Sequence, residues 1–249
     1  YKRQPFLPIQ FFKSRKVIER TLAPEIIFKS SGTTETGRSQ HFVADLNLYQ
    51  QSLTRGFELT YGKVGQTCII ALLPNYQEQG DSSLVFMIDN LIKQSDNSKS
   101  GFYLNEENTL LETLLELKKS KTKTLLIGVT YALLDFIEKQ KIDFDNLIVM
   151  ETGGMKGRRK EIVREELHEI LCTGFGVSQI HSEYGMTELL SQAYSCGDGL
   201  FIAPPWMKIF IRQISDPLSF CEENKTGGVN VVDLANLNSC CFISTQDLG

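Results

Sequence analysis

Residues 30–39 read SSGTTETGRS, a stretch that combines hydroxyl side chains with two glycines. It follows a short apolar run at 24–28 and precedes a long amphipathic segment that begins near Gln40. Glycines let a backbone approach a ligand closely, and exposed N–H groups and hydroxyls donate to anionic oxygens. The stretch therefore predicts a phosphate-binding loop between a strand and a helix. A plain surface turn is the alternative for the loop taken alone.

This loop differs from a Walker sequence, which requires G-x-x-x-x-G-K-[ST]. Gly32 and Gly37 have the required spacing, but Arg38 stands where the lysine is needed. A guanidinium binds phosphate bidentately, so Arg38 keeps the capacity to hold an anion. The loop also lacks the G-x-G-x-x-G pattern of dinucleotide-binding folds. A P-loop kinase or hydrolase is accordingly disfavoured.

Short apolar runs alternate with amphipathic segments as far as about residue 192. The runs typical of strands lie at 26–28, 67–73, 124–129, 147–150 and 178–181. Apolar residues at helical spacing recur over 42–57, 84–92, 110–117 and 162–171. Short, continuously apolar strands are typical of a sheet that is covered on both faces. The alternation predicts an α/β fold with a mostly parallel sheet flanked by helices.

The pattern changes after about Gln192. Residues 207–211, 228–232 and 240–244 have the character of strands separated by turns, and no helical period is visible there. We therefore expect an α/β core at 1–192 and a β-rich subdomain of the same large domain at 193–249.

Composition narrows the class of protein. The 249 residues are 41% hydrophobic and 22% charged, which is ordinary for a globular chain. A net charge of −4 argues against a nucleic-acid binder, whose surface should be basic. The six cysteines form no C-x-x-C pair, so we expect neither a structural zinc site nor a secreted disulfide scaffold, and a cytoplasmic location. No apolar run approaches 18 residues, so no membrane span is expected.

Three separated stretches together resemble the adenylate-forming superfamily, which includes acyl-CoA synthetases, adenylation domains and firefly luciferase. The phosphate loop of that superfamily runs [ST]-S-G-[ST]-T-G-x-P-K, and residues 30–38 are similar to it. Its second motif, aromatic-Gly-x-Thr-Glu, is matched in full by YGMTE at 184–188. Its third, Thr-Gly-Asp, is matched by TQD at 245–247, with Gln246 where glycine is usual. The order and the wide spacing of the three also agree.

A finer resemblance is to the acyl-protein synthetase family of the bacterial bioluminescence fatty-acid reductase complex. The segments that carry it are 5–13, 39–41, 153–157 and 247–249. The chain begins at Tyr1 rather than at a methionine, and it ends within a stretch similar to the family's run into a C-terminal portion. We therefore expect a fragment that lacks the N-terminal part of the family and its small C-terminal domain.

The resemblance implies ATP-dependent activation of a carboxylic acid, with ATP and Mg²⁺ as cofactors. The acid's carboxylate attacks the α-phosphorus of ATP to give an acyl-adenylate and pyrophosphate, and a thiol then takes the acyl group. Catalysis of such a step is mostly positioning and electrostatics. The implied partners are a fatty or related acid, a thiol of a protein cysteine or of coenzyme A, and a reductase or acyl-transferase protein.

The resemblance also assigns roles to the residues of the three stretches. Arg38, Thr187 and Glu188 are the expected catalytic residues: Arg38 holds the β- and γ-phosphates, Thr187 contacts the α-phosphate, and Glu188 binds Mg²⁺. The remaining expected ATP contacts are Ser31, Gly32, Thr33 and Thr34 at the phosphates, Gly153 and Gly154 at the adenine edge, Tyr184 on the adenine face, and Asp247 at the ribose hydroxyls.

Several alternatives remain open from the sequence. Glu35 and Gly37 stand where the superfamily loop usually has glycine and proline. With Gln246, Glu35 favours a non-catalytic nucleotide-binding module, and a phenylacetate-type acyl- or aryl-CoA ligase is the nearest rival enzyme. Glu188 and Asp247 could also be solvated carboxylates, and Gly153–Gly154 a plain turn. His181 either lines the site or packs in the core, and Cys240 and Cys241 are expected to serve core packing.

Overall fold

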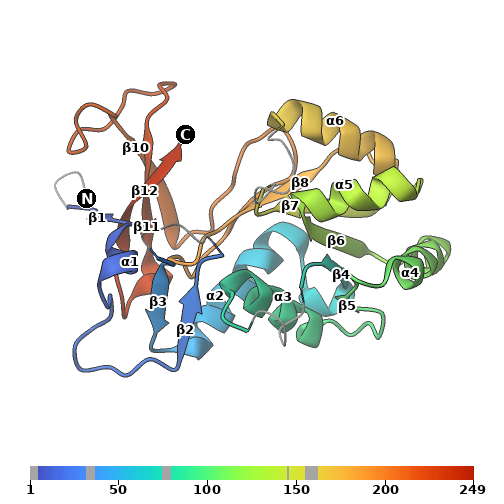
Figure 1. Cartoon of the computed structure of the whole chain (residues 1–249), viewed down its shortest axis with the longest axis horizontal. Helices are drawn as coiled ribbons and strands as arrows, with labels where there is room; N and C mark the ends of the chain where they lie inside the picture. The colour runs from blue at the N-terminus through green and yellow to red at the C-terminus, as the bar shows by residue number, and fades with distance from the viewer. Residues whose placement is uncertain (1–4, 32–36, 75–79, 145, 155–161) are drawn as a thin grey trace.

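The computed structural model describes residues 5–31, 37–74, 80–144, 146–154 and 162–249. In that part of the chain, a six-stranded sheet flanked by helices stands beside a smaller sheet that includes the C-terminal strand (Figure 1). The six-stranded sheet has the order β5-β4-β6-β7-β8-β9. Its strands are β4 (Cys68–Leu72), β5 (Gly101–Phe102), β6 (Thr124–Val129), β7 (Leu147–Thr152), β8 (His181–Tyr184) and β9 (Ala193–Ser195).

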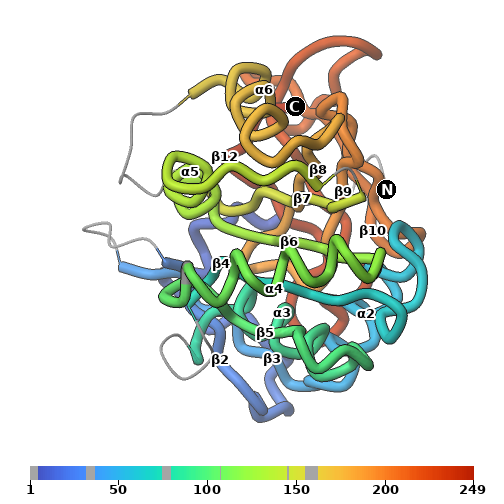
Figure 2. Tube along the Cα trace, turned by 90° about the vertical axis from the view of Figure 1, so that its right-hand side faces the viewer, coloured from blue at the N-terminus to red at the C-terminus, as the bar shows by residue number. Residues whose placement is uncertain are grey.

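Helices cover both faces of this sheet. Strands β4 to β8 are parallel, and β9 pairs antiparallel with β8. Helix α3 (Ser83–Gln94) follows β4, whereas α4 (Glu107–Ser120), α5 (Thr130–Lys139) and α6 (Arg164–Phe175) follow β5, β6 and β7. The chain moves one way from β4 to β5 and the other way from β5 to β8. Right-handed crossovers therefore place α3 on one face and α4, α5 and α6 on the other (Figure 2).

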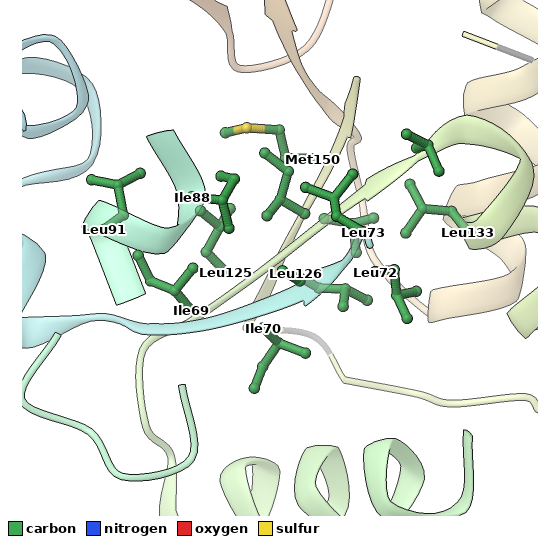
Figure 3. Packing of buried hydrophobic residues seen from close by; sticks show 14 of the residues in the cluster. Ile69, Ile70, Leu72, Leu73, Ile88, Leu91, Leu125, Leu126, Leu133 and Met150 are labelled. Carbon is green, nitrogen blue, oxygen red and sulfur yellow. The ribbon is translucent and has the colours of Figure 1, made fainter. Parts of the chain in front are cut away.

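The central strands are buried on both sides, as their continuous apolar runs predict. Every residue of β4 and β6 is buried. Figure 3 shows Ile69 and Leu125 beside Ile88 and Leu91 of α3, whereas Ile70 points to the opposite side of the sheet. The predicted α/β fold with a mostly parallel sheet flanked by helices is confirmed, and this double coverage explains why the strands do not alternate in polarity.

The predicted amphipathic helix begins later than expected. Helix α2 (Leu46–Tyr61) starts where the Asp45 side chain accepts a hydrogen bond from the Leu48 amide at 2.9 Å. Residues upstream form β3 (Gln40–Val43), which pairs antiparallel with β2 (Ile26–Lys29). The expectation that residues 30–39 join a strand to a helix is wrong, because they join two strands. Phe42 shares the helical spacing of α2, but His41 and Val43 are buried around it with the two-residue period of a strand.

Other local predictions are also corrected. Residues 26–28 do form a strand, but it belongs to the β2–β3 pair rather than to the parallel sheet. The strand expected at 178–181 lies at 181–184 as β8, and the amphipathic pattern at 162–171 becomes a helix only from Arg164. The sequence did not predict β5, β9 or α5. Helix α5 follows β6 without an intervening turn, so one apolar run contains both elements.

The smaller sheet has the order β1-β12-β11-β10. It contains β10 (Met207–Arg212), β11 (Gly228–Asp233) and β12 (Phe242–Leu248), which confirms the predicted β-rich character of the C-terminal region. A short strand from the N-terminal region, β1 (Leu7–Pro8), adds parallel to β12. Phe12 of α1 (Phe11–Ser14) packs in a buried cluster with Val231 and Ile243. The division into residues 1–192 and 193–249 stays a prediction.

Within the described ranges, no helix is both long and apolar enough to cross a membrane.

Candidate active site

A cavity of about 290 Å³ lies at the carboxyl ends of β7 and β8. The end of β2 and the start of α3 also line it. Ligands of open α/β sheets bind outside the carboxyl ends of the strands, so this is the expected place for a site. Four of the predicted site residues line it: Ser31, Gly153, Tyr184 and Thr187. These residues come from segments up to 156 positions apart in the sequence (187 minus 31).

Tyr184 and Asp247 connect two of the three sequence motifs directly. The Tyr184 hydroxyl donates a hydrogen bond to Asp247 Oδ2 at 2.8 Å. Burial raises the pKa of Tyr184, and the nearby Asp247 carboxylate raises it further, so the phenol stays protonated and donates. The Thr245 hydroxyl accepts from the Asp247 amide at 3.1 Å and donates to the Val229 carbonyl at 3.0 Å. Asp247 is thereby fixed beside the wall of the cavity.

Thr187 is held by a histidine from the segment that follows the predicted phosphate loop. His41 has no exposed surface, and its Nδ1 lies 2.9 Å from the Thr187 carbonyl oxygen. Burial lowers the pKa of His41 to about 4, so the imidazole is neutral at pH 7. Since a carbonyl can only accept, Nδ1 carries the proton and Nε2 accepts from the Ser239 hydroxyl at 3.0 Å. His41 therefore links β3 to the second motif.

Glu188, the predicted magnesium ligand, lies next to the same loop. It is 5% exposed, and its carboxylate accepts a hydrogen bond from the Ser39 side chain. Burial raises the pKa of Glu188, against the opposing effects of Ser39 and of the Lys13 ammonium. Its main-chain carbonyl accepts from the Asn236 amide at 2.7 Å. The end of the predicted phosphate loop and the second motif therefore meet at Glu188.

Each of the three nitrogens of the Arg38 guanidinium donates a hydrogen bond to a protein oxygen. Its Nη1 and Nη2 lie 3.0 and 3.3 Å from the two carboxylate oxygens of Asp81. Nη2 also donates to the Lys29 carbonyl at 3.3 Å, and Nε donates to the Ser30 carbonyl. Lys29 Nζ is 3.6 Å from Asp81, and Lys29 lines the cavity. The sequence pointed to Arg38 as a cation, but it gave no sign of Lys29 or of Asp81, which lies 43 residues away.

Gly153 and Gly154 follow β7 with φ angles of +70° and +61°. Both angles lie in the left-handed region that favours glycine. A Cβ on Gly154 would meet no atom within 4 Å, so the requirement there is conformational rather than steric. The two glycines turn the chain beside the cavity, which Gly153 lines, and their expected role at the adenine edge stays a prediction.

Glu183, which the sequence analysis did not single out, also lines the cavity. Its Oε2 accepts a hydrogen bond from the Thr152 hydroxyl at 2.6 Å. Burial raises the pKa of Glu183 to about 7, with a further contribution from Glu151. A carboxyl group placed directly before the aromatic residue of the second motif was the available signal in the sequence.

Among the described residues, four predicted site residues do not line the cavity: Arg38, Gly154, Glu188 and Asp247. Gly32, Thr33, Thr34 and Glu35 lie outside the described residues, so their expected roles stay predictions. His181 Nδ1 lies 3.1 Å from the Tyr61 hydroxyl, which agrees with its alternative as a core histidine. Among the residues that the structure describes, no group of three or more His, Cys, Asp or Glu could hold a metal ion.

No protein-family model matches the chain, and no curated protein matches it at a significant level. Solved structures do match. ATP-bound MatB from Rhodopseudomonas palustris has a TM-score of 0.60 and 12% identity, over 82% of this chain and 38% of that one. The long-chain-fatty-acid-CoA ligase FadD1 from Archaeoglobus fulgidus has a TM-score of 0.62 and 15% identity, over 90% and 48%. The amide bond synthetase McbA from Marinactinospora thermotolerans has a TM-score of 0.56 and 14% identity, over 90% and 46%.

The chain shares their fold. This is the fold that the adenylate-forming resemblance implied, and the prediction of a large-domain-like α/β architecture is confirmed. The chain spans less than half of the length of each of the three structures. At these identities the likeness concerns the fold, and the finer resemblance to acyl-protein synthetases stays a prediction.

Proposed function

We propose that this chain carries the ATP-binding and acid-activating part of an adenylate-forming ligase. The observation that carries the proposal is that hydrogen bonds join the three motifs beside one cavity, which residues of the first two motifs line. Contacts from Tyr184 to Asp247, from His41 to Thr187 and from Ser39 to Glu188 join them. MatB, whose fold the chain shares, has been solved with ATP bound, and two other structures of this fold are named as a ligase and a synthetase.

The nucleoside end of the site is built from Tyr184, Asp247 and the glycine turn. Tyr184 offers an aromatic face for the adenine, and Gly153 lets the base approach the backbone. A carboxylate has about four acceptor positions. Asp247 can therefore accept from the Tyr184 hydroxyl and from a ribose hydroxyl at the same time.

The phosphate end lies beside Ser31, Lys29 and Glu188. Ser31 and Lys29 line the cavity and supply a hydroxyl and a cation for anionic oxygens. Glu188 would hold Mg²⁺, which neutralises phosphate charge when bound. That ion is usually held by one or two protein carboxylates together with substrate phosphates. A single buried carboxylate next to the loop fits this habit better than it fits an all-protein metal cage.

The proposed first step joins an acid to AMP. A carboxylate oxygen of the substrate forms a bond to the α-phosphorus of ATP, and the bond from that phosphorus to the bridging oxygen breaks to release pyrophosphate. In the second step a thiol sulfur attacks the acyl carbon, and AMP leaves. Thr187 lines the cavity, and His41 fixes its main-chain carbonyl, so a contact of its hydroxyl with the α-phosphate would come from a restrained backbone.

The finer assignment concerns the acid and the thiol. The motif resemblance favours a fatty acid and transfer to a protein cysteine, with a reductase or acyl-transferase as partner. The similarity in fold to a long-chain-fatty-acid-CoA ligase supports coenzyme A as the alternative acceptor. Incubating the protein with ATP, acid and either thiol distinguishes the two, because only one of the thioesters should form at an appreciable rate.

A non-catalytic nucleotide-binding module is the rival from another class. The full pairing of Arg38 with Asp81 and main-chain carbonyls supports it, because that guanidinium is already occupied. Pyrophosphate exchange in the full-length protein decides between the two. The ligase is expected to exchange labelled pyrophosphate into ATP in the presence of its acid. A folded protein that binds ATP by calorimetry, yet exchanges with no acid of a broad panel, contradicts the ligase.

A further inference from the structure

One side of the cavity carries a fixed set of polar groups. The Tyr49 hydroxyl of α2 donates to the Ser83 carbonyl at 3.1 Å, and the Gln192 side chain hydrogen-bonds to Tyr49. Thr152 donates to Glu183 at 2.6 Å. Tyr49, Thr152, Glu183 and Gln192 all line the cavity. This polar wall consists of side chains whose positions are set by their own hydrogen bonds.

The backbone around Glu183 leaves room for its carboxylate. A Cβ on Gly185 would lie 2.3 Å from Glu183 Oε1, so any larger residue at 185 would displace that oxygen. Thr152 and Glu183 share a face of adjacent parallel strands, one position beyond the paired Glu151 and Ser182. The Thr152 hydroxyl therefore holds one carboxylate oxygen, and the other occupies the space that a side chain at position 185 would fill.

Glu183 and Tyr184 are adjacent in β8, so their side chains leave the strand in opposite directions. Tyr184 turns to Asp247, on the side assigned to the nucleoside. Glu183 turns to Thr152 and so belongs with the polar wall near α2 and α3. Leu84 and Met87 of α3 add apolar surface in the same cavity. A molecule there meets both an apolar surface and a half-buried carboxyl.

A plain alkyl chain is a poor match for this wall. Packing methylene groups against a carboxyl removes its water without supplying a hydrogen bond, which is unfavourable. The raised pKa of Glu183, about 7, shows that burial already disfavours its ionised form. A hydroxyl or ammonium group placed against Glu183 removes the penalty by donating to the carboxyl.

We propose that Glu183 selects the acid substrate, and that the acid activated here carries a hydroxyl or ammonium donor on its carbon chain. This inference rests on the proposed function of the cavity, and it narrows the substrate from acids in general to donor-bearing acids. Unsubstituted fatty acids are then the poorer substrates. Glu183 acts in recognition, because it touches the acid away from the carboxylate that reacts.

The test is pyrophosphate exchange in the full-length protein with pairs of acids that have equal carbon number. One member of each pair carries a hydroxyl or amino group, at a position varied along the chain, and the other is unsubstituted. The wild type is expected to prefer a donor-bearing member at least tenfold in kcat/KM for the acid, as for sites built to hydrogen-bond a substrate group. Glu183→Leu is expected to lose or reverse that preference while KM for ATP changes less than twofold.

Two further variants make the result specific. Ser182→Ala alters the neighbouring buried residue on the other face of β8, and it is expected to keep the wild-type preference. Glu183→Gln preserves shape, so it tests the carboxyl even if the leucine variant unfolds, and it is expected to weaken selection of an ammonium most.

Different results overturn different claims. If the wild type uses unsubstituted acids as well as their donor-bearing partners, the inference is wrong while the proposed function stands. A rise in KM for ATP with an unchanged acid preference would assign Glu183 to the nucleotide instead, which also overturns it. Exchange with no acid in a folded protein removes the proposed function, and the inference falls with it.

Discussion

The Tyr184 hydroxyl donates to Asp247 Oδ2 at 2.8 Å, which joins the end of β8 in the large sheet to β12 in the small one. The two residues are 63 positions apart, and each belongs to a separate adenylation-type motif. A phenol that is kept protonated by burial and by its acidic partner is a stable donor. The pair therefore fixes an aromatic face and a carboxylate in one geometry, which the proposed nucleotide site requires.

Tyr184→Phe tests this pre-arrangement. The variant keeps the ring but releases Asp247, so we expect KM for ATP in pyrophosphate exchange to rise about three- to tenfold, the value of roughly one hydrogen bond. Tyr194→Phe is the matched control. In the described part of the chain the buried Tyr194 hydroxyl has no hydrogen-bond partner, so its loss should leave KM unchanged. Equal KM values for wild type and Tyr184→Phe contradict the proposed role.

His41 predicts how stability depends on pH. Its pKa is about 4 in the folded protein, below the value of about 6.5 for an unfolded histidine. The unfolded chain therefore takes up the proton first as pH falls. The contribution of His41 to the free energy of unfolding is complete above pH 6.5 and is lost as pH falls from about 6.5 to 4. The total loss is about 3 kcal/mol.

His41→Gln measures that contribution. Glutamine has a donor and an acceptor for Thr187 and Ser239 but does not titrate. Denaturant unfolding between pH 7 and pH 4 is expected to show a smaller loss of free energy in the variant than in the wild type. The comparison uses the slope of unfolding free energy against pH in each protein, because the substitution also changes packing and so changes the absolute free energies. Parallel slopes exclude a neutral buried His41.

The Asp81–Arg38 pair predicts a modest but measurable coupling. Both side chains are about a third exposed, at 35% and 36%, so solvent screens the interaction. A double-mutant cycle with Asp81→Asn and Arg38→Gln is expected to give a coupling of about 0.5–1 kcal/mol in unfolding free energy. Asp89 and Lys93 form an ordinary i,i+4 pair on α3, and a cycle there should give less, about 0.3–0.5 kcal/mol. A larger coupling energy for Asp89–Lys93 than for Asp81–Arg38 would show that Asp81 does not hold Arg38 in place.

Two glycines with open space around them are expected to respond oppositely to alanine. Gly154 has φ of +61°, so Gly154→Ala should lower the unfolding free energy by about 1 kcal/mol through backbone strain. Gly56 lies inside α2 without positive φ, so Gly56→Ala should raise it by about 0.5–1 kcal/mol. Gly154→Asn should be milder than Gly154→Ala, because asparagine tolerates the left-handed region. Thermal unfolding of the three variants checks the signs.

The buried strands were the part of the fold that sequence reasoning recovered best. Continuous apolar runs predicted β4, β6 and β7 because both of their faces are covered. Sequence reasoning failed at β3, because its apolar residues continue the helical spacing of α2. It also failed at α5, because no turn separates that helix from β6. It misplaced β8 because that strand reads His-Ser-Glu-Tyr, with polar side chains at the site edge rather than an apolar run.

Local sequence patterns also predicted only part of the candidate site. Motif reasoning selected Tyr184, Glu188 and Asp247, because their residue types are specific to the chemistry. It missed His41, Asp81 and Glu183, because their importance comes from contacts across 146, 43 and 31 residues. Nothing in a local pattern distinguishes Asp81 from any other acid that precedes a helix. Partners of this kind become visible only when the fold brings distant segments together.

Glu188→Gln tests the proposed magnesium-binding role of Glu188. Removing the charge should reduce pyrophosphate exchange by at least a hundredfold, because an amide binds Mg²⁺ far more weakly than a carboxylate. Burial raises the pKa of Glu188, so the ionised group weakens folding above the unfolded value near 4.5. The amide removes that penalty, and the unfolding free energy at pH 7 is expected not to fall. Glu116→Gln, at an exposed carboxylate on α4, should leave exchange unchanged. Full exchange in Glu188→Gln at low Mg²⁺ would refute the metal role, whereas lost exchange with lost folding would instead make Glu188 structural.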